Sequence, residues 1–87
     1  MKARSMNNMN KPLLNPADEL VEALAEIEHA QWLHWSQAVA ADVAAVTRDK
    51  WQRSWVDYAE LTDDLKEADR VWARKVATLL RQRKLIP

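Results

Sequence analysis

The sequence contains neither glycine nor cysteine among its 87 residues. Without cysteine there can be no disulfide framework and no cysteine-based metal site. Without glycine there can be no phosphate-binding loop of the Walker or Rossmann kind, because both loops need glycine where the backbone approaches phosphate. Tight two-residue hairpin turns are disfavoured for the same reason. These absences, with abundant alanine, leucine and glutamate, predict an almost wholly helical chain.

The sequence also lacks a long apolar run and an excess of charge of one sign. No stretch approaches the roughly 20 apolar residues that a membrane helix needs, and the N-terminal residues do not resemble a signal peptide. The 13 basic residues balance the 13 acidic ones, so there is no bulk attraction to nucleic acid or to an anionic membrane. We therefore expect a soluble cytoplasmic protein without a membrane partner.

The chain divides into an arm and one domain. Residues 1–14 are polar and show no periodicity, which is typical of a flexible N-terminal arm, and residues 15–87 form the domain. Asn15 is a good N-cap, and Pro16 suits the first position of a helix. We predict a long helix from Pro16 to about Val46, with a bend or break near residues 40–44.

Two further helices are predicted after the long one. Thr47 is an N-cap candidate for a short helix in which Trp51 and Trp55 share one face. Thr62 is the N-cap candidate of a last helix that runs to about Arg83. The predicted fold is thus all-α, a compact bundle of one long helix, one short helix and a C-terminal helix.

Helical periodicity places an acidic residue on the apolar face of each long helix. The two predicted apolar faces consist of Leu20, Val21, Leu24, Ile27, Trp32, Trp35, Val39 and Val43, and of Leu65, Ala68, Trp72, Val76, Leu79 and Leu80. Glu28 and Gln31 fall on the first face and Asp69 on the second. A buried carboxylate is costly unless it is paired. Either these polar groups satisfy one another and fix the helix register, or they line a small-ligand pocket between the helices.

Metal binding and catalysis are weakly indicated. His29 and His34 are five residues apart, so their side chains point in different directions and do not match the i, i+4 pairing of a helical metal site. Glu28 and Asp69 could form a carboxylate pair for acid–base chemistry, but no nucleophile or phosphate loop accompanies them. We expect no metal, no cofactor and no enzymatic activity.

The five tryptophans are unusually many for a chain of this length. Most should contribute to the core, but a ring that lines a groove could stack on a planar ligand. Basic side chains lie near them in the sequence, among them Lys66 and Arg70, but many acidic residues are interleaved. Nucleic acid is therefore an unfavourable partner, and a phosphate-bearing small molecule suits the pattern better.

Two segments resemble the ryanodine-receptor-type (RyR) repeat domain. "LAEIEHAQW" is similar to the opening of that repeat, and "VDYAELTDDLKEADR" is similar to its closing motif. The matching positions, between Leu24 and about Leu80, are Glu26, His29, Trp32, Tyr58, Leu61, Lys66, Asp69 and Arg70. Between the two motifs this chain has no glycine, unlike the receptor repeats, and looks more like small phage and bacterial variants.

The resemblance implies a non-catalytic protein that senses or sequesters a nucleotide-like or other anionic small molecule. Its likeness to the phage variants implies a phage-encoded protein that acts in the host cytoplasm. In this interpretation Trp32 and Tyr58 stack on the ligand or shape the pocket, Lys66 and Arg70 hold its anionic group, and His29 and Asp69 orient them. The alternative is a structural or interaction protein that forms a homo-oligomer through a tryptophan-rich helical face.

Overall fold

The computed structural model describes residues 15–87, and this part of the chain is all-α, as predicted. Its elements are α2 (Pro16–Ala38), the 3₁₀ turn η1 (Ala40–Asp42), α3 (Ala45–Gln52), the 3₁₀ turn η2 (Tyr58–Glu60) and α4 (Asp63–Gln82). The predicted arm, residues 1–14, lies outside the described residues. No helix within residues 15–87 is long and apolar enough to cross a membrane.

The beginning of α2 follows the predicted capping pattern. The Asn15 side-chain oxygen accepts a hydrogen bond of 2.8 Å from the backbone N–H of Asp18. Pro16 occupies the first helical turn, where a missing N–H costs nothing, and Asp18 and Glu19 place negative charge at the positive end of the helix. These local interactions explain why the sequence located this helix start correctly.

The region after α2 departs from the prediction in two ways. The helix ends at Ala38, eight residues before Val46, and η1 forms where a break was considered. The short helix then begins at Ala45 after an extended Ala44, so Thr47 lies within α3 and the prediction that it is the N-cap is wrong. No side chain caps this helix start, which is why no local signal marked it.

The tryptophans of this region contact α2 and do not stack on each other. Because α3 ends at Gln52, Trp51 and Trp55 do not share a helical face, and that prediction is wrong. The Trp51 ring packs against Trp32 and Trp35, with ring centroids 6.1 Å and 5.6 Å apart. The Trp55 indole N–H donates a 3.0 Å hydrogen bond to the hydroxyl of the fully buried Ser36. These contacts fold α3 back onto the C-terminal half of α2.

Both ends of α4 lie within one residue of their predicted positions. Thr62 is the N-cap residue, although its side chain makes no capping hydrogen bond. At the other end Lys84 has a φ of +58°, and the N–H of Leu85 donates to the carbonyl of Leu80. This is the Schellman arrangement, in which glycine usually takes the left-handed position. A lysine takes that position in this glycine-free chain.

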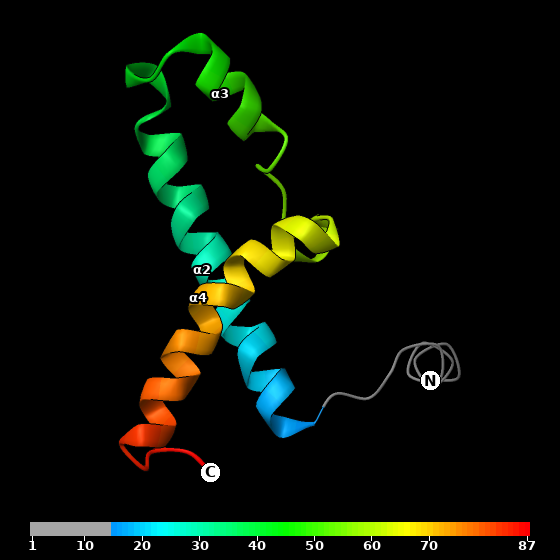
Figure 1. The fold of residues 1–87 in the computed structure, drawn as a ribbon. Helices are drawn as coiled ribbons and strands as arrows, with labels where there is room; N and C mark the ends of the chain where they lie inside the picture. The colour runs from blue at the N-terminus through cyan, green and yellow to red at the C-terminus, as the bar shows by residue number, and fades with distance from the viewer. Residues whose placement is uncertain (1–14) are drawn as a thin grey trace, which may run out of the picture.

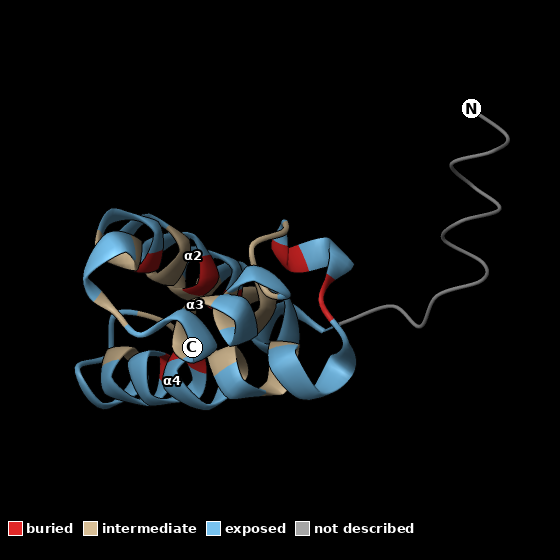
Figure 2. Ribbon diagram, turned by 90° about the horizontal axis from the view of Figure 1, so that it is seen from above, coloured by how far each residue is buried: buried red, intermediate tan, exposed pale blue. Residues whose placement is uncertain are grey.

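α2 and α4 cross and contact each other (Figure 1), and small residues are buried at this contact. Ala25 of α2 and Ala73 and Ala77 of α4 are completely buried. Small side chains let two helix backbones approach closely, so larger side chains must lie beside the contact. Most of the ribbon is consequently exposed, and few positions are buried (Figure 2).

The predicted apolar faces are therefore only partly buried. Exposed members of the two faces are Ile27, Trp35, Leu65, Ala68, Trp72, Val76 and Leu79, and Gln31 is exposed as well. The prediction followed the largest apolar residues, but the helices meet through the smallest ones. On α4 the completely buried residues, Ala73 and Ala77, are not on the predicted face.

Enlarging a side chain at the helix crossing should destabilise the fold. Ala25→Leu would force α2 away from α4, so we expect the free energy of unfolding to fall by about 1–3 kcal/mol. Ala30→Leu is the matched control, because Ala30 is exposed on the same helix. Urea unfolding followed by circular dichroism measures both variants. Equal stabilities of the two variants would contradict the alanine contact.

Candidate functional site

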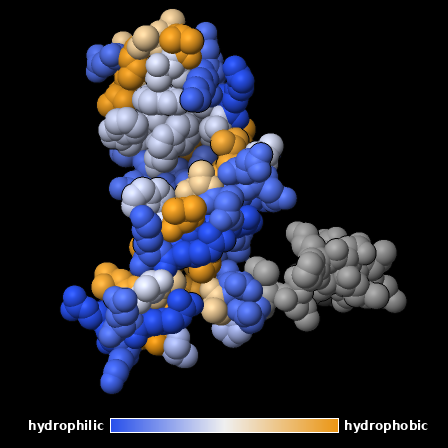
Figure 3. All heavy atoms as spheres, viewed as in Figure 1, coloured by the Kyte–Doolittle hydropathy of each residue, from blue (hydrophilic) through white to orange (hydrophobic). Residues whose placement is uncertain are grey.

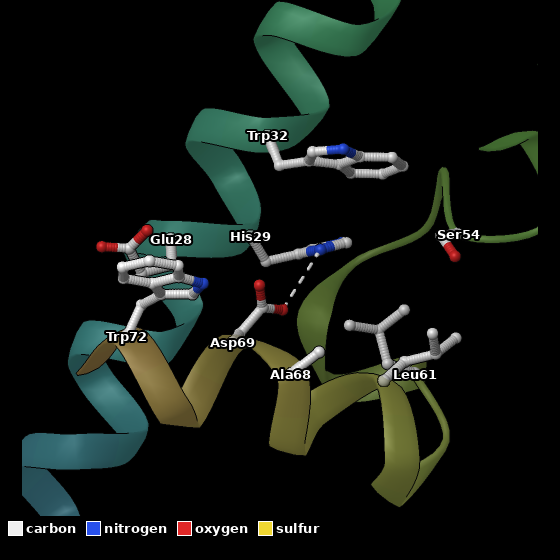
Figure 4. A pocket seen from close by; sticks show the side chains of 9 residues that line it. Glu28, His29, Trp32, Ser54, Leu61, Ala68, Asp69 and Trp72 are labelled. Carbon is white, nitrogen blue, oxygen red and sulfur yellow. Dashed lines mark ion pairs between the residues drawn. The ribbon is translucent and has the colours of Figure 1, made fainter. Parts of the chain in front are cut away.

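A pocket of about 350 Å³ opens beside the helix crossing. We call it the aromatic pocket; it lies between α2, α4 and the segment that joins α3 to η2 (Figure 4). Its lining residues are Glu28, His29, Trp32, Ser54, Leu61, Leu65, Ala68, Asp69 and Trp72. The fold thus brings together side chains that are up to 44 positions apart in the sequence, from Glu28 to Trp72.

His29 connects the three segments that form the aromatic pocket. Only 4% of the residue is exposed, and its Nε2 lies 2.6 Å from the backbone carbonyl of Val56. A carbonyl can only accept a hydrogen bond, so Nε2 carries a proton and donates. Nδ1 faces an oxygen of Asp69 at 3.6 Å, and the Trp32 ring is stacked over the imidazole with centroids 5.9 Å apart (Figure 4). The ring is therefore fixed from several sides.

Two carboxylates give the aromatic pocket a negative character. Burial raises the pKa of Asp69; the nearby His29 opposes this rise, and the negative charge of Glu28 adds to it. Within residues 15–87 Glu28 has no side-chain hydrogen bond or ion pair, and no lysine or arginine lines the pocket. The charges of Glu28 and Asp69 are therefore balanced inside the pocket by His29 alone, and only when its ring is protonated.

A second polar cluster lies on the other side of the helix crossing. Arg70 donates from Nε and Nη2 to the two carboxylate oxygens of Glu22, at 2.6 Å and 3.1 Å. The Tyr58 hydroxyl donates a 3.0 Å hydrogen bond to the same carboxylate, and the Lys66 ammonium lies 5.6 Å from the centroid of the Tyr58 ring. This cluster connects α2, η2 and α4.

The pKa shifts in this cluster favour the ionised form of Glu22. Hydrogen bonding from Arg70 lowers the pKa of Glu22, although burial opposes the shift. Burial, followed by the hydrogen bond to Glu22, raises the pKa of Tyr58 to about 12. Near neutral pH the cluster therefore consists of a carboxylate, a guanidinium and a neutral phenol, the arrangement in which every hydrogen bond in the cluster has a donor and an acceptor.

A wider depression, the charged groove, lies on this side. It has a volume of about 870 Å³ and is lined by Ala17, Asp18, Val21, Glu22, Asp63, Lys66, Arg70, Arg74, Ala77, Thr78 and Arg81. Both acidic and basic side chains line it. Arg70 is paired with Glu22, and Arg74 donates two hydrogen bonds to Glu67, so two of the groove's four basic side chains are already paired with a carboxylate.

The six predicted ligand-binding residues are divided between these places. His29, Trp32 and Asp69 line the aromatic pocket. Lys66 and Arg70 line the charged groove, and Tyr58 is buried between the two, with its ring centroid 6.4 Å from that of His29. Lys66 and Arg70, the residues predicted to hold the anionic group of the ligand, therefore do not line the same pocket as His29, Trp32 and Asp69.

Sequence reasoning missed two important side chains. Glu22, which binds Arg70 and Tyr58, is absent from the predicted site, and so is Trp72, which the periodicity placed only on the apolar face but which lines the aromatic pocket. A signal for Glu22 was present, because positions 22, 25, 29, 32 and 36 alternate in steps of three and four along one helix face. That face is centred on Ala25, which a search led by large apolar residues overlooks.

The site does not assemble recognised catalytic or metal-binding geometry in the described residues. Within residues 15–87 no group of three histidine, cysteine or acidic side chains is positioned to hold a metal ion. Ser54, His29 and Asp69 have the composition of a hydrolytic triad. However, the His29 nitrogen that would accept the serine proton, Nε2, instead donates to the Val56 carbonyl.

Comparisons with known proteins return no relative: no protein-family model matches the chain, and no curated protein or solved structure is significantly similar to it. The resemblance to the RyR repeat domain therefore stays a prediction from the residues that the two motifs share. The site has to be interpreted from its own geometry and charge.

Replacing Glu22 by glutamine should weaken the fold in a pH-dependent way. The pKa of Glu22 is lower in the folded protein than in the unfolded chain. At pH values above its unfolded-state pKa, the ionised carboxylate therefore stabilises the fold, and this stabilisation is lost as the pH falls through its folded-state pKa. We expect Glu22→Gln to lower the free energy of unfolding by on the order of 1 kcal/mol at pH 7, and by clearly less at pH 3. Urea titrations at both pH values measure the effect.

The control for this prediction is Glu26→Gln, since Glu26 is exposed on the same helix and has no ion pair among the described contacts. It should change stability little at either pH. A Glu22→Gln effect that is as large at pH 3 as at pH 7 would contradict a role for the ionised carboxylate.

Proposed function

We propose that this protein is a non-catalytic small-ligand-binding protein whose ligand occupies the aromatic pocket. The observation that carries the proposal is the pocket itself, an open pocket of about 350 Å³ that is bordered by three segments around the buried His29 ring. This volume lies within the range of roughly 300–1,000 Å³ that is typical of ligand sites. The lining combines apolar and aromatic walls with a few convergent polar groups, which is also typical of such sites.

The rigidity of the pocket wall supports this proposal. His29 is held by Val56 and faces Asp69, while Trp32 is held between His29 and Trp51. A ligand would therefore meet side chains that are already in place, so little conformational entropy would be lost on binding. The same contacts support a binding role over a catalytic one, because they leave the imidazole Nε2 no freedom to exchange a proton with a substrate.

A nucleotide-like ligand, which the RyR resemblance implies, would need a different arrangement from the one first expected. The residues expected to hold its phosphate, Lys66 and Arg70, line the charged groove and not the aromatic pocket. Arg70 already uses two of its N–H groups on Glu22. Nucleotides nevertheless belong in a binding screen, because they test the implication of the resemblance directly.

Ligand binding can be tested by following the indole N–H signals in an NMR fragment screen, with signals assigned through Trp→Phe variants. Ligands of the aromatic pocket should shift the signals of Trp32 and Trp72 and raise the melting temperature, because binding stabilises the native state. The signal of Trp55 is an internal control, since its N–H is bonded to Ser36 outside the pocket.

Ala68→Leu offers a matched blocking variant, because Ala68 lines the pocket and its side chain is not needed for the helix contact. The added atoms should abolish the shifts of Trp32 and Trp72, whereas Ala30→Leu on the exposed side of α2 should leave them unchanged. If ligands bind equally well to both variants, the aromatic pocket is not the binding site.

A second candidate function is self-association through α4, and the exposed apolar residues of that helix favour it. Leu65, Trp72, Val76 and Leu79 are between 36% and 57% exposed and are spaced seven, four and three residues apart. We call them the α4 stripe; the spacing is that of a helix-pairing seam. Figure 3 shows apolar side chains exposed among hydrophilic ones on one face of the molecule. A homo-oligomer would cover this stripe.

Self-association can be tested by light scattering and sedimentation over a range of micromolar concentrations. If the α4 stripe forms an interface, the mass should rise with concentration, and Leu79→Glu should reduce the association constant at least about tenfold, because a buried unpaired charge is costly. Val71→Glu is the matched control, since Val71 is also exposed and apolar but lies on another side of α4. A constant monomer mass for the unmodified protein would exclude this function.

A further inference from the structure

We propose that the ligand of the aromatic pocket is an organic cation with an alkylammonium group, such as a trimethylammonium head group. This inference rests on the proposed function and specifies its ligand class. It follows from three properties of the pocket, namely its charge, its aromatic walls and its apolar floor, each of which can be read from the residues that line it.

The first property is an excess of negative charge. Glu28 and Asp69 both line the pocket, and Glu28 is close enough for its charge to act on the Asp69 carboxyl. No lysine or arginine is among the lining residues. Of the described residues, only His29 forms an ion pair with Asp69, and none does so with Glu28. A cation entering the pocket would be attracted by both carboxylates, whereas a phosphate would be repelled.

The second property is the pair of indole rings. Trp32 and Trp72 come from different helices and both line the pocket, and the Glu28 and Asp69 carboxylates are drawn next to Trp72 in Figure 4. The face of an indole ring attracts cations more strongly than that of any other side chain. The Lys75 ammonium already lies 4.3 Å from the centroid of the Trp72 ring, so a ligand cation would have to contact the remaining face of that ring or the Trp32 ring.

The third property distinguishes an alkylammonium group from a metal ion. Leu61, Leu65 and Ala68 supply apolar contacts that suit methyl or methylene groups. Hard metal cations prefer six or more oxygen ligands, and no metal-binding cluster exists among the described residues. Aromatic side chains are a known way to bind quaternary ammonium groups.

The experiment compares choline with 3,3-dimethyl-1-butanol, which has the same shape but carries a carbon in place of the charged nitrogen. Both are titrated into the protein at a concentration where light scattering reports one species, and the indole signals of Trp32 and Trp72 are followed by NMR. We expect choline to bind in the millimolar range and about tenfold more tightly than its neutral analogue, because only choline gains the carboxylate and cation–π interactions.

Two glutamine variants test whether the carboxylate of Glu28 causes the tighter binding of choline. Glu28→Gln should weaken choline binding about threefold to tenfold and leave the neutral alcohol unaffected, because it removes one attracting charge from a partly exposed site. Glu26→Gln is the matched control, as Glu26 is a nearby glutamate of α2 that does not line the pocket. Melting temperatures of the free variants establish that both are folded.

The possible results of the titrations distinguish a wrong ligand class from a wrong proposed function. If the neutral alcohol binds as tightly as choline, or if adenosine monophosphate shifts the Trp32 and Trp72 signals more strongly, the cation inference is overturned while the pocket stays a ligand site. If choline, the alcohol and the nucleotide all fail to shift these signals at high millimolar concentration, both the cation inference and the proposed function are overturned.

Discussion

The close approach of α2 and α4 at Ala25, Ala73 and Ala77 is the constraint on which the rest of the structure depends. Because no large side chain fits into this contact, the bulky and polar residues of both helices lie beside it. The fully buried set among residues 15–87 is consequently small, and it cannot supply as much hydrophobic stabilisation as a core of large aliphatic residues would. Polar contacts next to the crossing therefore carry an unusual share of the specificity of this fold.

Two polar connections between α2 and α4 flank the alanine contact. On one side Glu22 binds Arg70 and Tyr58; on the other side His29 faces Asp69 and also binds the Val56 carbonyl. Both connections also reach the chain between α3 and α4. Of the three polar residues on the predicted apolar faces, Glu28 and Asp69 line the aromatic pocket, whereas Gln31 is exposed. The Glu22 cluster joins the two helices on the other side of the crossing.

The balanced formal charge conceals a separation of charge across the helix crossing. The charged side chains of the aromatic pocket are Glu28, Asp69 and His29, whereas Lys66, Arg70, Arg74 and Arg81 line the charged groove together with three acidic residues. A net charge of zero argues against bulk attraction to a charged polymer, but it says nothing about the potential inside one pocket. The distribution of these side chains around two crossing helices decides which small molecules each cavity can attract.

The sequence by itself determined the helical class, the start of α2 and both ends of α4, because local interactions such as the Asn15 cap and helical propensity set them. It also identified His29, Trp32 and Asp69, three residues of the pocket. Only the tertiary structure decided where α3 begins, which face of α4 meets α2 and that Lys66 and Arg70 lie apart from the pocket. Periodicity ranks the faces of a helix by hydropathy, whereas helix packing also selects for small side chains. The side of the helix crossing on which a residue lies depends on the positions of both helices, which one helix sequence does not contain.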